Sequence, residues 1–159
     1  MRIIIGNDQG GYDLKEKIKD RLFLHKTKKE FKITAVYDYG CLCPDPVDYP
    51  DFAEPVARQI SRGFADLGIL ICGSGIGMSI AANKLPGIRA AVCDNPVSAR
   101  LAREHNDANI LCLGARFVAP EYAQEIVKVF LTTKFSNEER HKRRIKKISQ
   151  LEKSVRKKK

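Results

Sequence analysis

The sequence predicts an α/β domain in which five parallel strands form one sheet with helices on both faces. Two observations lead to this prediction: strand-like and helix-like segments alternate along the chain, and the strand-like segments are short and apolar throughout. Uniformly apolar strands are typical of parallel sheets that are buried on both sides. Regular alternation is typical of right-handed βαβ units. With 159 residues and no internal repeat or linker, the chain has the size of one domain.

The predicted elements follow one another in a regular order. Strands are expected at 2–6, 33–37, 67–71, 89–93 and 110–113, and helices at 13–25, 52–62, 78–82, 96–104 and 120–131, with a last helix from about residue 137 into the C-terminal tail. The first helix carries Leu14, Ile18 and Leu22 near helical spacing, and Pro120 stands in the first turn of its helix. The proline-rich segment 38–50 predicts a loop. This order predicts a Rossmann-like three-layer αβα sandwich with a five-stranded parallel sheet.

The segment after the third strand is the most informative part of the chain. Cys72 stands where a buried strand gives way to a helix of small residues, and Gly73, Gly75 and Gly77 follow at every second position. Such a turn can aim several N–H groups at one point, next to the positive end of a helix. By itself the segment fits an anion-binding or catalytic loop and a purely structural turn equally. A dinucleotide site is disfavoured, because the glycine spacing is one residue short of G-x-G-x-x-G.

Ligands of doubly wound sheets bind beyond the carboxyl ends of the strands, at the point where the strand order reverses. The residues expected at that edge are Asn7, Asp8 and Gln9 after the first strand, Cys72 to Gly77 after the third, and Asp94 after the fourth.

The charge of the chain is concentrated at its C-terminus. Residues 140–159 contain 11 of the 29 Lys and Arg residues and one of the 19 acidic residues, so residues 1–139 are neutral overall. A terminal basic run is usually a solvated helix face or tail, and a neutral body argues against specific nucleic-acid binding.

Composition also predicts the compartment. The chain has no long apolar stretch for a membrane and no signal-peptide pattern, which predicts a soluble cytoplasmic protein. The five cysteines form no CxxC pair and fit reduced thiols, with Cys41-x-Cys43 interpreted as incidental rather than as half of a metal site.

Seven stretches, in order and with matching gaps, extend over about residues 2–150. They are Gly6-Asn7-Asp8-Gln9-Gly10-Gly11, Asp48-Tyr49-Pro50, residues 71–84, Gly87-Ile88-Arg89-Ala90, His105-Asn106-Asp107-Ala108-Asn109, Leu113-Gly114-Ala115-Arg116 and Arg140-His141-x-x-Arg144. Together they resemble the type B ribose-5-phosphate isomerases, a family that also includes the galactose-6-phosphate isomerase subunits.

The resemblance implies an aldose–ketose isomerase that interconverts ribose 5-phosphate and ribulose 5-phosphate through an enediolate, in the non-oxidative branch of the pentose phosphate pathway. It implies no metal and no organic cofactor. Two alternatives stay open: an isomerase of a hexose 6-phosphate such as allose or galactose 6-phosphate, and a non-catalytic sugar-phosphate-binding protein.

The resemblance also implies roles for individual residues. Cys72 matches the catalytic base, and a thiol suits that role when a helix N-terminus and nearby donors stabilise its thiolate. The N–H groups of Gly73 to Gly77, including Ile76, together with the Ser74 hydroxyl, are expected to stabilise the developing oxyanion. His105 matches the residue that assists ring opening, although a histidine at a helix end is often only a polar cap.

Further matches concern the sugar and its partners. Asn106 and Tyr49 match substrate-binding residues, and Asp8 is expected to act on the sugar hydroxyls while also capping the helix that starts near Tyr12. Gln9 stands where the family usually has histidine, so the side chain can exchange hydrogen bonds but cannot take up a proton near neutral pH.

The phosphate is expected at the start of the basic tail. Arg140 and Arg144 are four residues apart and share one helix face, and they match the family's phosphate-binding pair. His141 and Arg116 match further residues at the same end of the substrate. Family sites lie between two subunits, which implies a homodimer or a tetramer. The predicted domain covers residues 1–150, and the basic tail 151–159 has no assigned role.

Overall fold

The computed structural model describes residues 1–23, 31–42 and 44–156 of the chain. Five parallel strands form one sheet in the order β2-β1-β3-β5-β4, which confirms the predicted fold class. The strands are β1 (Arg2–Asn7), β2 (Ala35–Asp38), β3 (Leu67–Cys72), β4 (Ala90–Val92) and β5 (Ile110–Gly114). The strand order reverses between β1 and β3, so the carboxyl ends of these two strands form the switch point at which ligands of such sheets bind.

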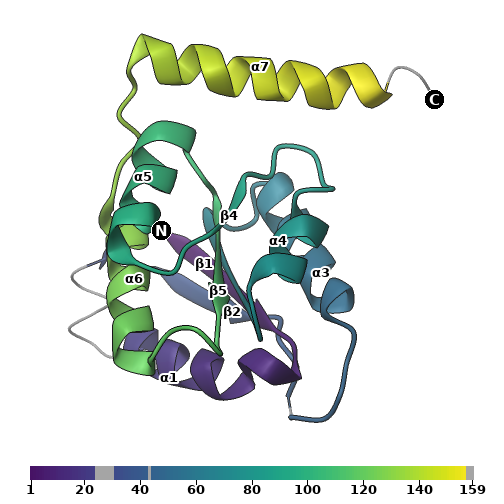
Figure 1. Ribbon diagram of the computed structural model, residues 1–159, viewed down its shortest axis with the longest axis vertical. Helices are drawn as coiled ribbons and strands as arrows, with labels where there is room; N and C mark the ends of the chain where they lie inside the picture. Colours follow the sequence, from purple (N-terminus) through teal and green to yellow (C-terminus); the bar gives the residue numbers. More distant parts are fainter. Residues whose placement is uncertain (24–30, 43, 157–159) are drawn as a thin grey trace.

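Helices cover both faces of this sheet (Figure 1). They are the short 3-10 helix η1 (Gln9–Gly11), α1 (Tyr12–Phe23), α3 (Tyr49–Ser61), α4 (Ile76–Ala82), α5 (Pro96–Asn106), α6 (Pro120–Thr132) and α7 (Glu139–Arg156). One hydrophobic cluster joins the sheet to α1, α5 and α6, and a second joins it to α3 and α4. Helix α7 lies outside these layers and crosses one end of the molecule (Figure 1).

Side chains alternate between the two clusters along each central strand. In β1, Ile3 and Ile5 belong to the cluster with α1, α5 and α6, whereas Ile4 belongs to the cluster with α3 and α4. All three are fully buried. Because successive residues of a strand point to opposite faces, a sheet covered on both sides requires the uninterrupted apolar runs seen in the sequence.

Several helices begin earlier or end later than the sequence predicts. Helix α3 starts at Tyr49 with Pro50 in its first turn, so the predicted loop 38–50 is shorter than expected, since proline is tolerated at a helix start. Helix α5 continues to Asn106 and is followed by Asp107 in a left-handed conformation. The predicted end of the first helix, at residues 24 and 25, lies outside the described residues.

Helix α7 contacts the rest of the chain through one stripe of its surface. His141 is buried, and Ile145, Ser149 and Glu152 are half-buried, at the spacing of one helix face. Near the C-terminal end of the helix, the Gly87 N–H donates to both carboxylate oxygens of Glu152 at 3.1 Å. The helix runs without a break past residue 150, so the predicted boundary between domain and tail has no counterpart in secondary structure. In the described part of the chain, no helix has the length and apolarity needed to cross a membrane.

Candidate active site

The turn that joins β3 to α4 holds the thiol of Cys72 at the switch point. The Sγ atom of Cys72 accepts a hydrogen bond from the Gly75 N–H at 3.1 Å, and the residue is 4% exposed. Gly75 has a φ of 75°, in the left-handed region that favours glycine, and it is the N-cap residue of α4. One N–H group of the glycine-rich turn, that of Gly75, therefore points at the sulfur.

The thiols outside this turn have a different environment. Burial raises the pKa of Cys93 to about 11, and it raises the pKa of Cys112 well above its ordinary value. Both groups therefore stay protonated near neutral pH and act as small apolar side chains. Cys43 lies outside the described residues.

Tyr49 and Gln9 border the same turn. The ring of Tyr49 lies so close to Gly77 that a Cβ atom on that residue would be 2.8 Å from the ring, so any larger residue would displace it. The Oε1 atom of Gln9 accepts the Val47 N–H at 3.0 Å, which ties the segment before α3 to the end of β1. Gln9 thus also holds the backbone that leads to Tyr49.

Asp8 follows β1 beside the turn. Its Oδ1 atom accepts the Gly11 N–H at 3.1 Å, so Asp8 caps the 3-10 helix η1 and not, as expected, the helix that starts at Tyr12. Burial raises the pKa of this carboxyl group, against the opposing N–H groups of Gly11 and Gly10 and the charge of Arg116. The side chain of Arg116 lies next to Gly73.

We refer to Asp8, Gln9, Tyr49, Cys72–Gly77 and Arg116 as the Cys72 end. Asp94 lies apart from this group of residues: it follows β4, at the edge of the sheet and two strands away from β3, and accepts a hydrogen bond from the side chain of Asn95.

A second group of predicted residues gathers where α5 meets α7. The rings of His105 and His141 face each other with centroids 4.3 Å apart and planes 37° from parallel. His141 is 2% exposed, and its Nδ1 atom is hydrogen-bonded to the Ser136 hydroxyl at 2.7 Å. Arg140 forms an ion pair with Glu138 at 2.8 Å. We refer to His105, Asn106, Arg140, His141 and Arg144 as the His105 end.

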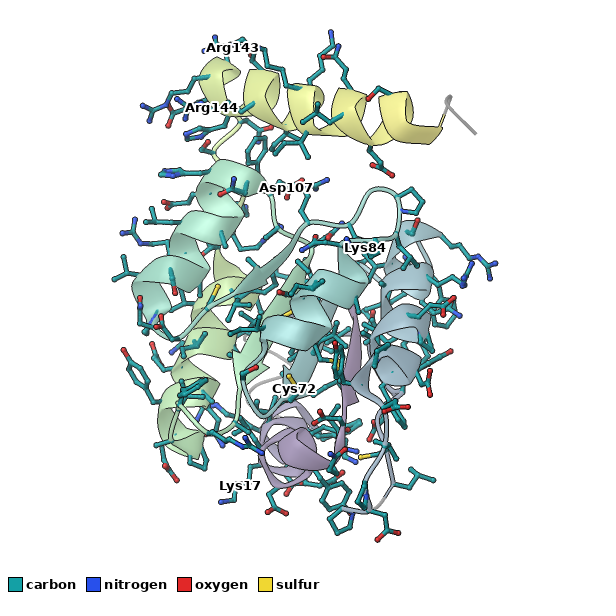
Figure 2. The ribbon with its side chains drawn as sticks, turned by 45° about the vertical axis from the view of Figure 1, so that its right-hand side comes forward. Lys17, Cys72, Lys84, Asp107, Arg143 and Arg144 are labelled. Carbon is teal, nitrogen blue, oxygen red and sulfur yellow. The ribbon has the colours of Figure 1, made fainter. Side chains whose placement is uncertain are left out.

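The two ends lie on opposite sides of the molecule. Figure 2 shows Cys72 at the lower end of the layered body and Arg144 at the upper end. The topology explains this separation: Cys72 ends a parallel strand, whereas His105 ends a helix that runs antiparallel to the strands and so reaches their amino ends. Within one chain, Arg116 therefore lies with Cys72 and away from Arg140 and Arg144, although the resemblance assigns all three to the same end of the substrate.

Three further polar residues support the two ends: Asn7, which the sequence places at this edge of the sheet, and Lys15 and Ser136, to which no role is assigned in the sequence analysis. The buried Asn7 donates from Nδ2 to the Asp8 carbonyl oxygen at 2.8 Å and to the Cys41 sulfur at 3.0 Å. Lys15, which is 1% exposed, donates to the Cys41 carbonyl oxygen at 3.1 Å. Nothing in the pattern of apolar residues along the first helix indicates that Lys15 is buried. Ser136 did carry a signal, because Ser136-x-x-Glu139 has the capping-box pattern that precedes a helix.

Comparisons with known proteins place the chain in a family. The family model described as Ribose/Galactose Isomerase matches residues 3–148. Ribose-5-phosphate isomerase B from Escherichia coli is 41% identical over 151 residues, which cover 95% of this chain and 96% of that protein. D-erythrulose-4-phosphate isomerase from Pectobacterium atrosepticum is 43% identical over 135 residues, 85% of each chain.

A solved structure gives the same result at the level of the fold. Ribose-5-phosphate isomerase B from Clostridium thermocellum superimposes with a TM-score of 0.90 at 49% sequence identity, covering 98% of this chain and 99% of that one. The matched residues include both ends of the site. This chain belongs to the Ribose/Galactose Isomerase family, whose members are aldose–ketose isomerases.

Proposed function

We propose that the protein interconverts ribose 5-phosphate and ribulose 5-phosphate, with Cys72 as the base and His105 as the residue that assists ring opening. The observation that carries this proposal is the position of the Cys72 sulfur, 3.1 Å from the Gly75 N–H in the turn at the switch point. The resemblance of the sequence and the names of the relatives support the choice of substrate.

The proposed chemistry is a proton transfer between neighbouring carbons. The Cys72 thiolate takes the proton from carbon 2 of the open-chain aldose, the electrons of that C–H bond form the C1=C2 double bond, and the carbonyl oxygen becomes negative. The N–H groups of the turn and the Ser74 hydroxyl stabilise this charge. A proton then passes from the hydroxyl on carbon 2 to the oxygen on carbon 1. As Cys72 returns its proton to carbon 1, the electrons on the carbon 2 oxygen form the C2=O bond of the ketose.

Ring opening and phosphate binding are assigned to the His105 end. His105 takes the proton of the anomeric hydroxyl and gives it to the ring oxygen as the ring C–O bond breaks, which leaves an aldehyde at carbon 1 and a free hydroxyl. Asn106 binds sugar hydroxyls. Arg140 and Arg144 are exposed near the start of α7 and bind the phosphate through charge-assisted hydrogen bonds.

A second copy of the chain brings the two ends together. Four exposed apolar side chains lie on β4, which is an edge strand, and on the two helices connected to it: Ile76, Ile80, Val92 and Val97. This β4-edge patch begins beside the Cys72 turn, since Ile76 and Val97 stand in the first turns of α4 and α5 and Val92 ends β4. A twofold axis through such a patch places the Cys72 end of one copy beside the His105 end of the other.

The test is a panel assay with the purified full-length protein. Ribose 5-phosphate, allose 6-phosphate, galactose 6-phosphate and erythrulose 4-phosphate are each incubated in D₂O, and both isomerisation and deuterium uptake at carbon 2 are followed by NMR. We expect ribose 5-phosphate to have the highest kcat/KM and to incorporate deuterium. Faster turnover of a hexose or tetrose phosphate would show that this sugar phosphate, and not ribose 5-phosphate, is the preferred substrate. Binding of a sugar phosphate without turnover of any of them would contradict the enzymatic role.

A matched pair of variants tests the base. Cys72→Ala is expected to lower kcat by on the order of a thousandfold or more while the affinity for the sugar phosphate stays nearly the same, because the base is removed but the anchor is kept. Cys93→Ala is the control, since that buried thiol lies outside both ends and is expected to keep kcat. Retention of more than about a tenth of the activity in Cys72→Ala would exclude Cys72 as the base.

A further inference from the structure

Ser136 occupies a junction between three parts of the His105 end. Its N–H donates to the Glu104 carbonyl oxygen at 3.1 Å, next to His105 at the end of α5. Its hydroxyl oxygen is 2.7 Å from His141 Nδ1, in the first turn of α7, and it accepts the Glu138 N–H at 3.3 Å. A single short side chain thus connects the end of one helix to the start of another.

The hydrogen bonds of this hydroxyl leave its proton available for His141. A serine hydroxyl has one proton and two lone pairs, and the Glu138 N–H occupies one lone pair. The proton is then free to point at His141 Nδ1, which accepts it when the imidazole is neutral. A neutral imidazole that accepts at Nδ1 carries its own proton on Nε2.

The surroundings of His141 favour the neutral imidazole. Burial lowers the pKa of His141, the charges of His105, Arg140 and Arg144 lower it further, and Glu138 opposes them. The groups facing the ring are therefore mostly cationic. A neutral ring avoids adding another positive charge among them, and it keeps the contact with His105 free of repulsion.

We propose that Ser136 is a positioning residue that holds His141 as the Nε2–H tautomer, so that His141 offers a hydrogen-bond donor to the anion bound between Arg140 and Arg144. The inference that this anion is a sugar phosphate rests on the proposed function. The hydrogen bond also fixes the plane of the His141 ring that faces His105. Ser136 therefore orients both histidines without itself contacting the substrate.

The direct test reads the tautomer by NMR in the full-length protein labelled with ¹⁵N-histidine. The sequence has three histidines, so a His141→Gln variant assigns the signal. At neutral pH the long-range ¹H–¹⁵N spectrum is expected to show His141 with its proton on Nε2. Ser136→Ala is expected to give a mixture of tautomers, and Ser136→Thr, which keeps the hydroxyl, is expected to restore the wild-type pattern.

A control on the same helix separates this effect from a general loss of structure. Ser154 is exposed, and its hydroxyl donates to the Leu151 carbonyl oxygen at 2.8 Å, far along α7 from His141. Ser154→Ala is expected to leave the His141 signal unchanged. A wild-type His141 that is protonated on Nδ1 or doubly protonated, or a tautomer unaffected by Ser136→Ala, would overturn the proposal.

Binding and kinetics supply the second readout. Titration with inorganic phosphate is expected to show about three- to tenfold weaker binding in Ser136→Ala, as for the loss of one hydrogen bond, with recovery in Ser136→Thr. The KM for sugar phosphate should rise by a similar factor, with a smaller change in kcat; a fall in kcat alone would contradict the anion-binding role. If the wild-type protein isomerises no sugar phosphate, the proposed function fails while the tautomer and phosphate measurements still decide the role of Ser136.

Discussion

At the scale of single residues, the site contains a conflict between stability and chemistry at Asp8. The carboxyl group is buried and its pKa is raised above the ordinary 3.8, so the folded chain binds the proton more tightly than the unfolded chain does. Ionisation of Asp8 therefore lowers stability as the pH rises through the folded-state pKa. A residue that costs stability at neutral pH is typical of a functional site.

The variant Asp8→Asn tests this conflict. Asparagine can still cap Gly11 through its side-chain oxygen but carries no charge, so we expect a higher melting temperature at neutral pH. We also expect kcat/KM to fall by more than about tenfold, since hydrogen bonds to a charged group are lost. Thermal unfolding at several pH values should show the stability gain disappearing as the pH falls to 3.8, because Asp8 is then protonated in the wild-type protein. A gain independent of pH would show that the charge is not its cause.

At the scale of elements, a partly exposed ionic network around the buried Lys15 holds the end of β2 against α1. Lys15 Nζ lies 3.2 Å from Asp38 Oδ2 and 2.9 Å from Glu16, and Lys19 Nζ lies 2.8 Å from Asp38. Burial acts to raise the pKa of Asp38, but hydrogen bonds from Lys19, Gly40 and Lys15 outweigh it, so the pKa is lowered below 3.8. The network anchors the start of the segment that leads to Tyr49.

Removal of the Asp38 charge should therefore destabilise the fold. Asp38→Asn leaves the buried Lys15 with Glu16 as its charged partner, and we expect a loss of about 1–2 kcal/mol in the free energy of unfolding at neutral pH. Because the pKa is lowered, the contribution is complete above 3.8 and is lost as the pH falls through the folded-state value, so denaturant unfolding should show a shrinking difference in acid. Glu139→Gln breaks an exposed pair with Lys142 and, as the control, should change stability by less than about 0.5 kcal/mol.

Helix α7 offers a second prediction at this scale, because Glu152 makes the last hydrogen bonds that the described residues show between this helix and the body of the protein. A chain truncated after Glu152 keeps the bonds from Gly87, so its melting temperature, turnover and oligomeric state should match those of the full chain, with less adsorption to polyanions. A chain truncated after Gln150 loses these bonds, and we expect a melting temperature lower by about 2–4 °C. Glu152→Ala in the full chain isolates the carboxylate. If both truncations behave alike, the Glu152 contact does not stabilise α7.

At the scale of the whole molecule, the separation of the two ends allows a test of whether a second copy of the chain completes the site. Cys72→Ala and His105→Ala homodimers are each expected to be nearly inactive. In a mixed dimer, one site receives both substitutions and the other receives neither. If the variants pair at random, about half of the dimers are mixed and each of these has one intact site, so co-expression should restore about a quarter of the wild-type activity per site. Mixing two batches of the same variant is the control. No recovery in dimers shown by mass spectrometry to be mixed would mean that each site is built within one chain.

The sequence by itself determined the elements and the chemistry of the turn. Apolar runs such as Leu67–Cys72 predict buried strands because both of their faces must avoid water, and three alternate glycines after Cys72 predict converging N–H groups because the backbone conformation is local. The helix that starts at Pro120 begins where the sequence predicts, because proline is favoured in the first turn of a helix. The helix that starts at Tyr49 begins before the predicted position 52, since helix ends depend on tertiary contacts as well as on capping.

Only the tertiary structure decided which of these residues meet. That His105 faces His141, that Arg116 lies over Gly73 and that Lys15 is buried against Asp38 all depend on how distant segments cross the sheet. The separation of Cys72 from Arg144 depends on strand direction, because the carboxyl end of a strand and the carboxyl end of the next antiparallel helix lie at opposite edges. A motif fixes residue types and spacing along the chain, whereas distances between motifs are fixed by packing.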